Sequence, residues 1–169
     1  MGGELTRSEL RIGTATADIT PSLRAALSGQ FNLRIAHTAA TPLTGNVVAQ
    51  ESSEGDRSHD MAILVSCDLV AIPNDLLALV RDEEHKRLPK LDVNEILLSA
   101  IHTHTAAVLE NGEYLIPKEG VTQVDAYRAF FVQRVSEAVA QAWNGRRPGS
   151  VTWGLSHAVV ANNRRCLRQ

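Results

Sequence analysis

The middle of the chain places an amphipathic helix between two apolar strands, and this order constrains the fold most. Residues 61–70 form a continuous apolar run, which is typical of a strand buried on both faces. Asn74 is expected to cap a helix over residues 75–88, which carries an apolar stripe and is followed by Pro89. A second apolar strand is expected over residues 95–101. Strand, helix and strand in this order favour a parallel pair joined by a right-handed crossover.

The flanking segments extend this unit into a layered domain. Strands are expected over residues 11–20, 47–51 and 151–160, with a polar turn over residues 52–60. The clearest helix is expected over residues 125–144, because apolar side chains recur there every three to four residues. These side chains are Tyr127, Phe131, Val135, Val139 and Ala142. The predicted fold class is α/β, a layered mixed β-sheet flanked by helices.

Composition limits the class of protein. The 169 residues are 44% hydrophobic and 21% charged, which predicts one globular unit. A net charge of −2 gives no basic surface for nucleic acid, and the longest apolar stretch is too short for an integral membrane segment. The first residues lack the apolar core of a signal peptide, which favours a cytoplasmic location, or a secreted one if the N-terminus is processed. Residues 21–45 form a long irregular segment, and such segments are often functional.

The motif His102-Thr103-His104 directly follows the apolar strand expected over residues 95–101. Sites in α/β sheets form at the carboxyl ends of strands. On an extended backbone, residues i and i+2 point to the same face with their Cα atoms roughly 7 Å apart. One imidazole can then bind a metal, for which zinc is suited, while the other hydrogen-bonds a substrate; both can also bind one ion. Two surface histidines in a loop are the alternative interpretation.

Four further residues have side chains for which the sequence suggests a structural or functional role. Asp68 interrupts an apolar run, and it either orients one of the two histidines or caps a loop at the end of the strand. Arg164 near the C-terminus either holds an oxyanion or belongs to a solvated tail. His157 is expected within the strand over residues 151–160, and Cys67 as a small buried apolar side chain.

Four short segments share their order and spacing with those of a known family. They are residues 12–21 (IGTATADITP), 65–69 (VSCDL), 99–105 (SAIHTHT) and the pair Asn163-Arg164. In this order they resemble the neutral/alkaline (non-lysosomal) ceramidase family over nearly the whole chain. The resemblance implies that residues 1–169 are the N-terminal part of a ceramidase-like catalytic domain, and that the α/β fold is incomplete.

The resemblance implies a zinc-dependent amidase that hydrolyses the amide of an N-acylsphingosine to a fatty acid and a sphingoid base. His102 matches the first zinc ligand of that family, His104 the histidine that contacts the substrate, and Arg164 an arginine that lines the active site. A ceramide-like lipid amide, or another small amide, is then the expected substrate, and Zn the expected cofactor. Attack on the carbonyl by a zinc-polarised water is the implied reaction.

The sequence departs from the family pattern in two ways. Residues 105–107 are Thr-Ala-Ala where the family has Ser-Gly-Pro, and the remaining zinc ligands of the family would lie beyond Gln169. Because a zinc site takes three or more protein ligands, the isolated chain is expected to be inactive. The missing C-terminal part of the same domain is therefore an expected partner. An apolar patch left by that part is expected to make the isolated chain dimerise or aggregate.

Two other interpretations compete with the amidase. The first is a catalytically incomplete fragment or pseudoenzyme that retains the fold without a complete zinc site. The second is an unrelated metal hydrolase built on His-x-His, which needs further clustered His and Asp residues that the positions after His104 do not supply.

Overall fold

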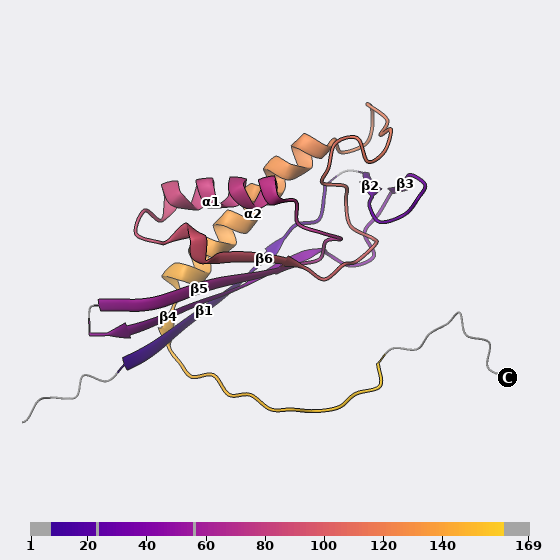
Figure 1. The fold of residues 1–169 in the computed structure, drawn as a ribbon. Coiled ribbons are helices and arrows are strands. Elements are labelled where there is room, and N and C mark those ends of the chain that lie inside the picture. Colours follow the sequence, from indigo (N-terminus) through magenta and orange to yellow (C-terminus); the bar gives the residue numbers. More distant parts are fainter. Residues whose placement is uncertain (1–7, 23, 56, 161–169) are drawn as a thin grey trace, which may run out of the picture.

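The computed structural model describes residues 8–22, 24–55 and 57–160, and its centre is a five-stranded mixed sheet (Figure 1). The strand order is β6-β5-β4-β1-β7, and β2 and β3 form a separate antiparallel pair. The strands are β1 (Ser8–Asp18), β2 (Ala25–Leu27), β3 (Arg34–Ala36), β4 (Thr44–Glu54), β5 (Arg57–Cys67), β6 (Ile96–Ala100) and β7 (Arg147–Pro148). The helices are α1 (Asn74–Arg87) and α2 (Val124–Asn144), with a 3-10 turn, η1 (Val93–Glu95), before β6. The predicted α/β class is confirmed.

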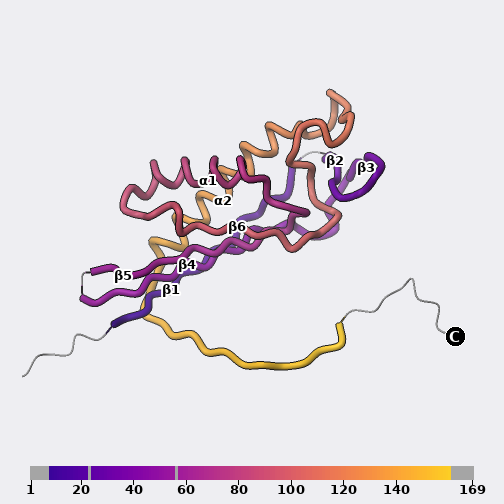
Figure 2. The backbone as a smooth tube through the Cα atoms, viewed as in Figure 1, coloured from indigo at the N-terminus to yellow at the C-terminus, as the bar shows by residue number. Residues whose placement is uncertain are grey.

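The sheet combines antiparallel and parallel pairing. Strands β1, β4 and β5 are antiparallel neighbours, whereas β6 lies parallel to β5 and places Leu98 beside Val65. Helix α1 connects this parallel pair, as the order of the apolar segments predicts. Both helices cover the same face of the sheet, and the backbone trace in Figure 2 shows the same two layers.

The core lies between the two helices and the sheet. All five apolar positions predicted for α2 are buried, and Leu76 and Val80 are buried on α1. Helix α2 packs directly on β1, where a Cβ atom added to Gly13 would lie 1.9 Å from the carbonyl oxygen of Ala142. Within the described ranges, no helix is long and apolar enough to cross a membrane.

No described helix covers the face of the sheet opposite α1 and α2. Burial alternates along the end of β5, where Val65 is buried and Leu64 is 45% exposed. Leu64 lies between Val48 of β4 and Leu97 of β6, and Leu97 is 53% exposed. The prediction of a strand buried on both faces is therefore wrong. A continuous apolar run has no alternation, so the sequence alone does not show whether one face of the strand is covered or both. The described helices cover one face only.

The strand predicted over residues 151–160 is absent from the described structure. Residues 149–160 follow β7 without forming a strand, so the placement of His157 in a strand is also wrong, and His157 is exposed. The apolar residues Val151 and Trp153 alternate as in a strand but are exposed. A strand needs a partner for its backbone hydrogen bonds. Because β7 pairs with β1 close to where β1 begins at Ser8, β1 has few residues left to pair with the chain after β7.

Two local expectations also need correction. Asn74 is the first residue of α1 rather than its cap; the capping position is Pro73, whose carbonyl oxygen accepts the N–H groups of Leu76 and Leu77. The polar turn expected over residues 52–60 is much shorter, because β4 and β5 both extend into it and pair there. Ser53 is buried, but the described charged residues of this segment occupy exposed or half-buried positions at the end of the sheet, where strand pairing costs no desolvation of buried charge.

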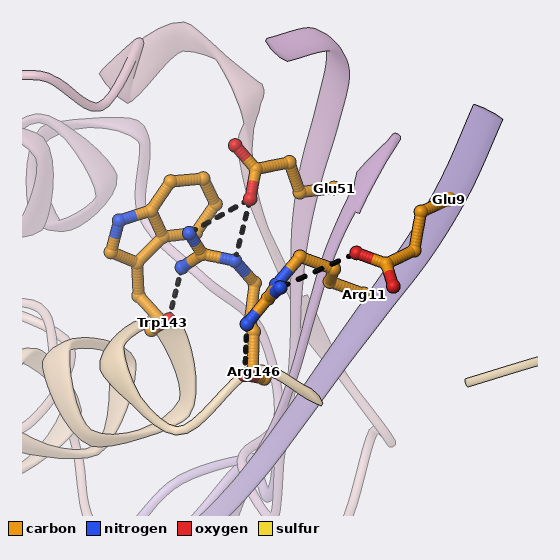
Figure 3. Close-up of polar contacts among 5 residues, drawn as sticks. All are labelled: Glu9, Arg11, Glu51, Trp143 and Arg146. Carbon is orange, nitrogen blue, oxygen red and sulfur yellow. Dashed lines mark hydrogen bonds and ion pairs between the residues drawn. The ribbon is translucent and has the colours of Figure 1, made fainter. Parts of the chain in front are cut away.

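The end of α2 is fixed to the sheet by an ion pair (Figure 3). The guanidinium of Arg146 donates from Nε and Nη2 to one carboxylate oxygen of Glu51 on β4, at 3.1 and 2.9 Å. The same guanidinium lies 3.2 Å from the ring centroid of Trp143, a cation–π contact. Arg11 on β1 donates to the carbonyl oxygen of Arg146 and pairs with Glu9. These contacts join β1, β4 and α2 at one corner of the molecule.

Candidate functional site

The histidine motif lies at the carboxyl ends of β5 and β6, at the end of the sheet beside β2 and β3 (Figure 1). The parallel pairing continues one step beyond β6, because Ile101 and Thr103 donate their N–H groups to Cys67 and Leu69, each at 3.1 Å. His102 between them has a φ of 65°, a left-handed conformation that costs energy for a residue with a Cβ atom. Such strain is common at functional sites, where the surrounding structure maintains it.

His102 bonds the backbone through one ring nitrogen and faces His104 with the other. Its Nδ1 lies 2.8 Å from the carbonyl oxygen of Val70. Because a carbonyl oxygen only accepts, Nδ1 of a neutral ring must carry the hydrogen, and Nε2 keeps a lone pair. Histidines that bind metals in proteins are oriented by this same type of bond to a backbone carbonyl. The geometry of His102 therefore suits a metal ligand.

The ring of His104 faces Nε2 of His102, the nitrogen that is not bonded to the backbone. The two Nε2 atoms are 3.3 Å apart, and the rings meet edge to face at 85° with centroids 4.9 Å apart. The two side chains meet, but not on the extended backbone from which this was predicted, because His102 is in the left-handed conformation. Both side chains are exposed at the surface of the described structure, so a ligand can reach the point between them.

The spacing of these nitrogens also fits a metal ion. Zinc–nitrogen bonds of about 2.0–2.1 Å in a tetrahedral site place two ligand nitrogens about 3.3–3.4 Å apart. The described residues include no group of three or more His, Cys, Asp or Glu that could hold an ion. His102 and His104 can therefore supply at most two ligands of a site that needs more.

Residues from the β2–β3 region surround His104. Arg34 at the start of β3 donates to the carbonyl oxygen of His104. Gly29 has a φ of 88° and lies against the ring, so that an added Cβ atom would be 2.7 Å from Cγ of His104. Gln30 places its Nε2 3.4 Å from Nδ1 of His104, and Tyr114 hydrogen-bonds the backbone of Gln30. Residues 21–45, expected to be irregular, contain β2, β3 and the start of β4, and the turn between β2 and β3 lies against His104.

The other residues singled out from the sequence lie elsewhere. Asp68 accepts the N–H and the hydroxyl of Thr44, at 2.7 and 2.8 Å, so it caps the loop at the end of β5 rather than orienting a histidine. Cys67 is buried, as predicted, and burial raises the pKa of its thiol to about 12, which leaves it a neutral core residue. Arg164 lies outside the described residues.

A small apolar cavity opens beside the histidine loop. Its volume is about 330 Å³, within the range of small-molecule pockets. Its walls come from β2, β3 and the loop after β6, and include Ala25, Leu27, Ala36, Leu43, Thr105 and Ala107. Thr105 joins the cavity to the site, because its hydroxyl lies 2.9 Å from that of Thr103, the residue between the two histidines.

Comparison with solved structures identifies a similar fold. Neutral ceramidase from Pseudomonas aeruginosa matches 85% of this chain with a TM-score of 0.71 and 18% sequence identity. A structure described as a ceramidase complexed with C2 matches the same share with a TM-score of 0.67 and 20% identity. No protein-family model and no curated protein matches the sequence. At these identities the likeness concerns the fold, and it confirms the predicted ceramidase-like architecture.

The chain spans only part of the proteins it resembles. The matched region is 23% of the Pseudomonas aeruginosa chain and 22% of the other. In its fold the chain is a neutral ceramidase-like fragment, built on a mixed sheet with two helices on one face.

Proposed function

We propose that this chain forms the N-terminal part of the catalytic domain of a zinc-dependent amidohydrolase of the neutral ceramidase type. The observation that carries the proposal is the orientation of His102, whose bond from Nδ1 to Val70 leaves the lone pair on Nε2 at the exposed side of the ring. This nitrogen lies at the carboxyl ends of two strands in a chain with the fold of part of a neutral ceramidase. His102 is the proposed zinc ligand.

Two polar groups are proposed to act on the substrate. His104 has its Nε2 3.3 Å from that of His102, so a group bound at His102 lies within its hydrogen-bonding reach. Arg164 is proposed to stabilise negative charge on the carbonyl oxygen during hydrolysis, as its match to the family suggests. A bound zinc ion would supply a Lewis acid and lower the pKa of water for attack on the amide.

The proposed substrate is a ceramide-like lipid amide. The cavity beside Thr105 is lined largely by alanine and leucine side chains, and a hydrocarbon chain is the ligand that such a surface accepts. The histidines at its edge would then meet the polar amide. The proposed location of the protein is cytoplasmic.

The remainder of the domain is the proposed partner. Two histidine nitrogens fall short of the ligands that zinc needs, so further ligands are expected from polypeptide outside the described residues. The exposed side chains of Leu64 and Leu97, beside the half-buried Val48, offer an apolar surface against which such polypeptide can pack. The alternative function, a fragment or pseudoenzyme without a complete zinc site, predicts neither bound zinc nor turnover in any longer form.

The test uses the complete polypeptide and one ligand substitution. We expect hydrolysis of an N-acylsphingosine and stoichiometric zinc in the wild type, with both lost in His102→Ala. His85→Ala is the matched control, because His85 is exposed on α1 and away from the motif. Unchanged zinc content and activity in His102→Ala would contradict the proposal.

A further inference from the structure

Gln30, in the turn between β2 and β3, places its side-chain amide beside the outer nitrogen of the His104 ring. Its Nε2 is 3.4 Å from Nδ1 of His104. We infer that Gln30 is a positioning residue that holds His104 in the tautomer with its hydrogen on Nε2. The catalytic meaning of this tautomer rests on the function proposed above, but the tautomer itself follows from hydrogen bonds within this chain.

The carbonyl oxygen of Val70 determines which atom donates in each hydrogen bond along the two histidine rings. The carbonyl oxygen of Val70 only accepts, so Nδ1 of His102 is its donor and Nε2 of His102 is an acceptor. The nitrogen that faces this acceptor at 3.3 Å, Nε2 of His104, must then carry a hydrogen for a bond to form. Nδ1 of neutral His104 is consequently an acceptor, and the amide N–H of Gln30 is the donor that matches it.

The backbone of Gln30 is anchored so that its side chain reaches this position. The hydroxyl of Tyr114 donates to the carbonyl oxygen of Gln30 and accepts its N–H at 3.2 Å. Tyr114 itself packs on a small apolar cluster formed by Ala26, Val108 and Val124. Gly29 lets the turn approach the imidazole, since any larger residue would meet Cγ of His104. The turn is therefore fixed both to a core cluster and to the ring.

The tautomer decides between two roles that the sequence leaves open for His104. With the hydrogen on Nε2, His104 donates to the lone pair of His102 in the metal-free chain. A metal bound at His102 would take that lone pair and leave the N–H of His104 as a hydrogen-bond donor beside it. A donor at this point suits a carbonyl oxygen of a substrate. Two ligands to one ion would instead require both Nε2 atoms to be free of hydrogen, which the amide N–H of Gln30 opposes.

The experiment measures the tautomers directly by nitrogen-15 NMR of the imidazole rings in the 169-residue chain without metal, at a pH where both rings are neutral. In the wild type we expect His102 with its hydrogen on Nδ1 and His104 with its hydrogen on Nε2. Gln30→Glu replaces the donor with a carboxylate acceptor, and we expect the hydrogen of His104 to move to Nδ1. Gln30 is exposed, so its replacement leaves the core intact.

Gln141→Glu is the matched control, because it makes the same chemical change at an exposed position near the end of α2 and should leave both rings unchanged. A His104 ring with its hydrogen on Nδ1 in the wild type would overturn the inference, as would a tautomer that Gln30→Glu does not alter. Because the spectra are recorded without zinc or substrate, failure of the amidase proposal would not affect this result.

Discussion

Replacing Glu84 with glutamine should remove a pH-dependent loss of stability that the wild-type carboxyl causes. Glu84 lies on α1 and is completely buried, and neither of its carboxylate oxygens has a hydrogen-bond partner within the described part of the chain. Burial raises the pKa of this carboxyl from 4.5 to about 7, against smaller lowering effects of Ser136 and Arg87. The folded protein therefore binds this proton more tightly than the unfolded chain does.

The sign and size of the effect follow from this difference. A raised carboxyl pKa stabilises the fold below pH 4.5, and that contribution is lost as the pH rises to about 7. The difference of about 2.5 pKa units corresponds to about 3 kcal/mol at pH 8, since one unit is about 1.4 kcal/mol. Glu84→Gln keeps the shape of the neutral side chain but cannot ionise. The variant should match the wild type at pH 4 and exceed its free energy of unfolding by up to about 3 kcal/mol at pH 8.

Urea denaturation followed by circular dichroism at the two pH values measures this difference. Glu110→Gln is the control, because Glu110 is exposed in the loop before α2 and its replacement should leave the pH dependence unchanged. Equal pH dependence of the wild type and Glu84→Gln would refute the reasoning. So would a variant that is less stable than the wild type at pH 8.

Two further predictions concern the corner of the fold and the face of the sheet opposite the helices. Arg146→Leu leaves Glu51 without its ion-pair partner at a place where both side chains are only about 15% exposed. The variant should lose about 2 kcal/mol of unfolding free energy, measured by urea denaturation, whereas Arg147→Leu at an exposed position should lose little. Equal losses in the two variants would contradict this prediction. Leu64→Thr should reduce self-association of the isolated chain in sedimentation velocity, whereas Leu79→Thr on the outside of α1 should not. A wild-type chain that stays monomeric at high concentration would rule out the role given to this face.

Elements with a clear period could be predicted from the sequence. The helical spacing from Tyr127 to Ala142 located α2 and its buried side, and the apolar runs around α1 located the parallel pair β5–β6. The motif His102-Thr103-His104 could also be placed at the end of a strand, because its position follows from the strand that precedes it. In each case the information lies within a short stretch of chain.

The remainder of the site could not be found in this way because it depends on contacts between distant segments. Gln30 is 74 residues from His104, and no local pattern links the two. Tyr114 acts through a hydroxyl that reaches a backbone 84 residues away. Residues 151–160 show the alternation of a strand, but a strand also needs a partner, and local sequence does not supply one. The sequence suggested a role for residues 21–45 only through their lack of a regular period, and it did not predict β2 and β3 within them.

The most direct test of the account is the native mass spectrum of the protein isolated from the cells that make it, with an antibody against this segment. The account predicts a polypeptide much heavier than 18.4 kDa that carries one zinc ion, because His102 alone cannot hold zinc and needs further ligands. A metal-free species at 18.4 kDa would contradict it. The fold would then be that of a ceramidase without a working site.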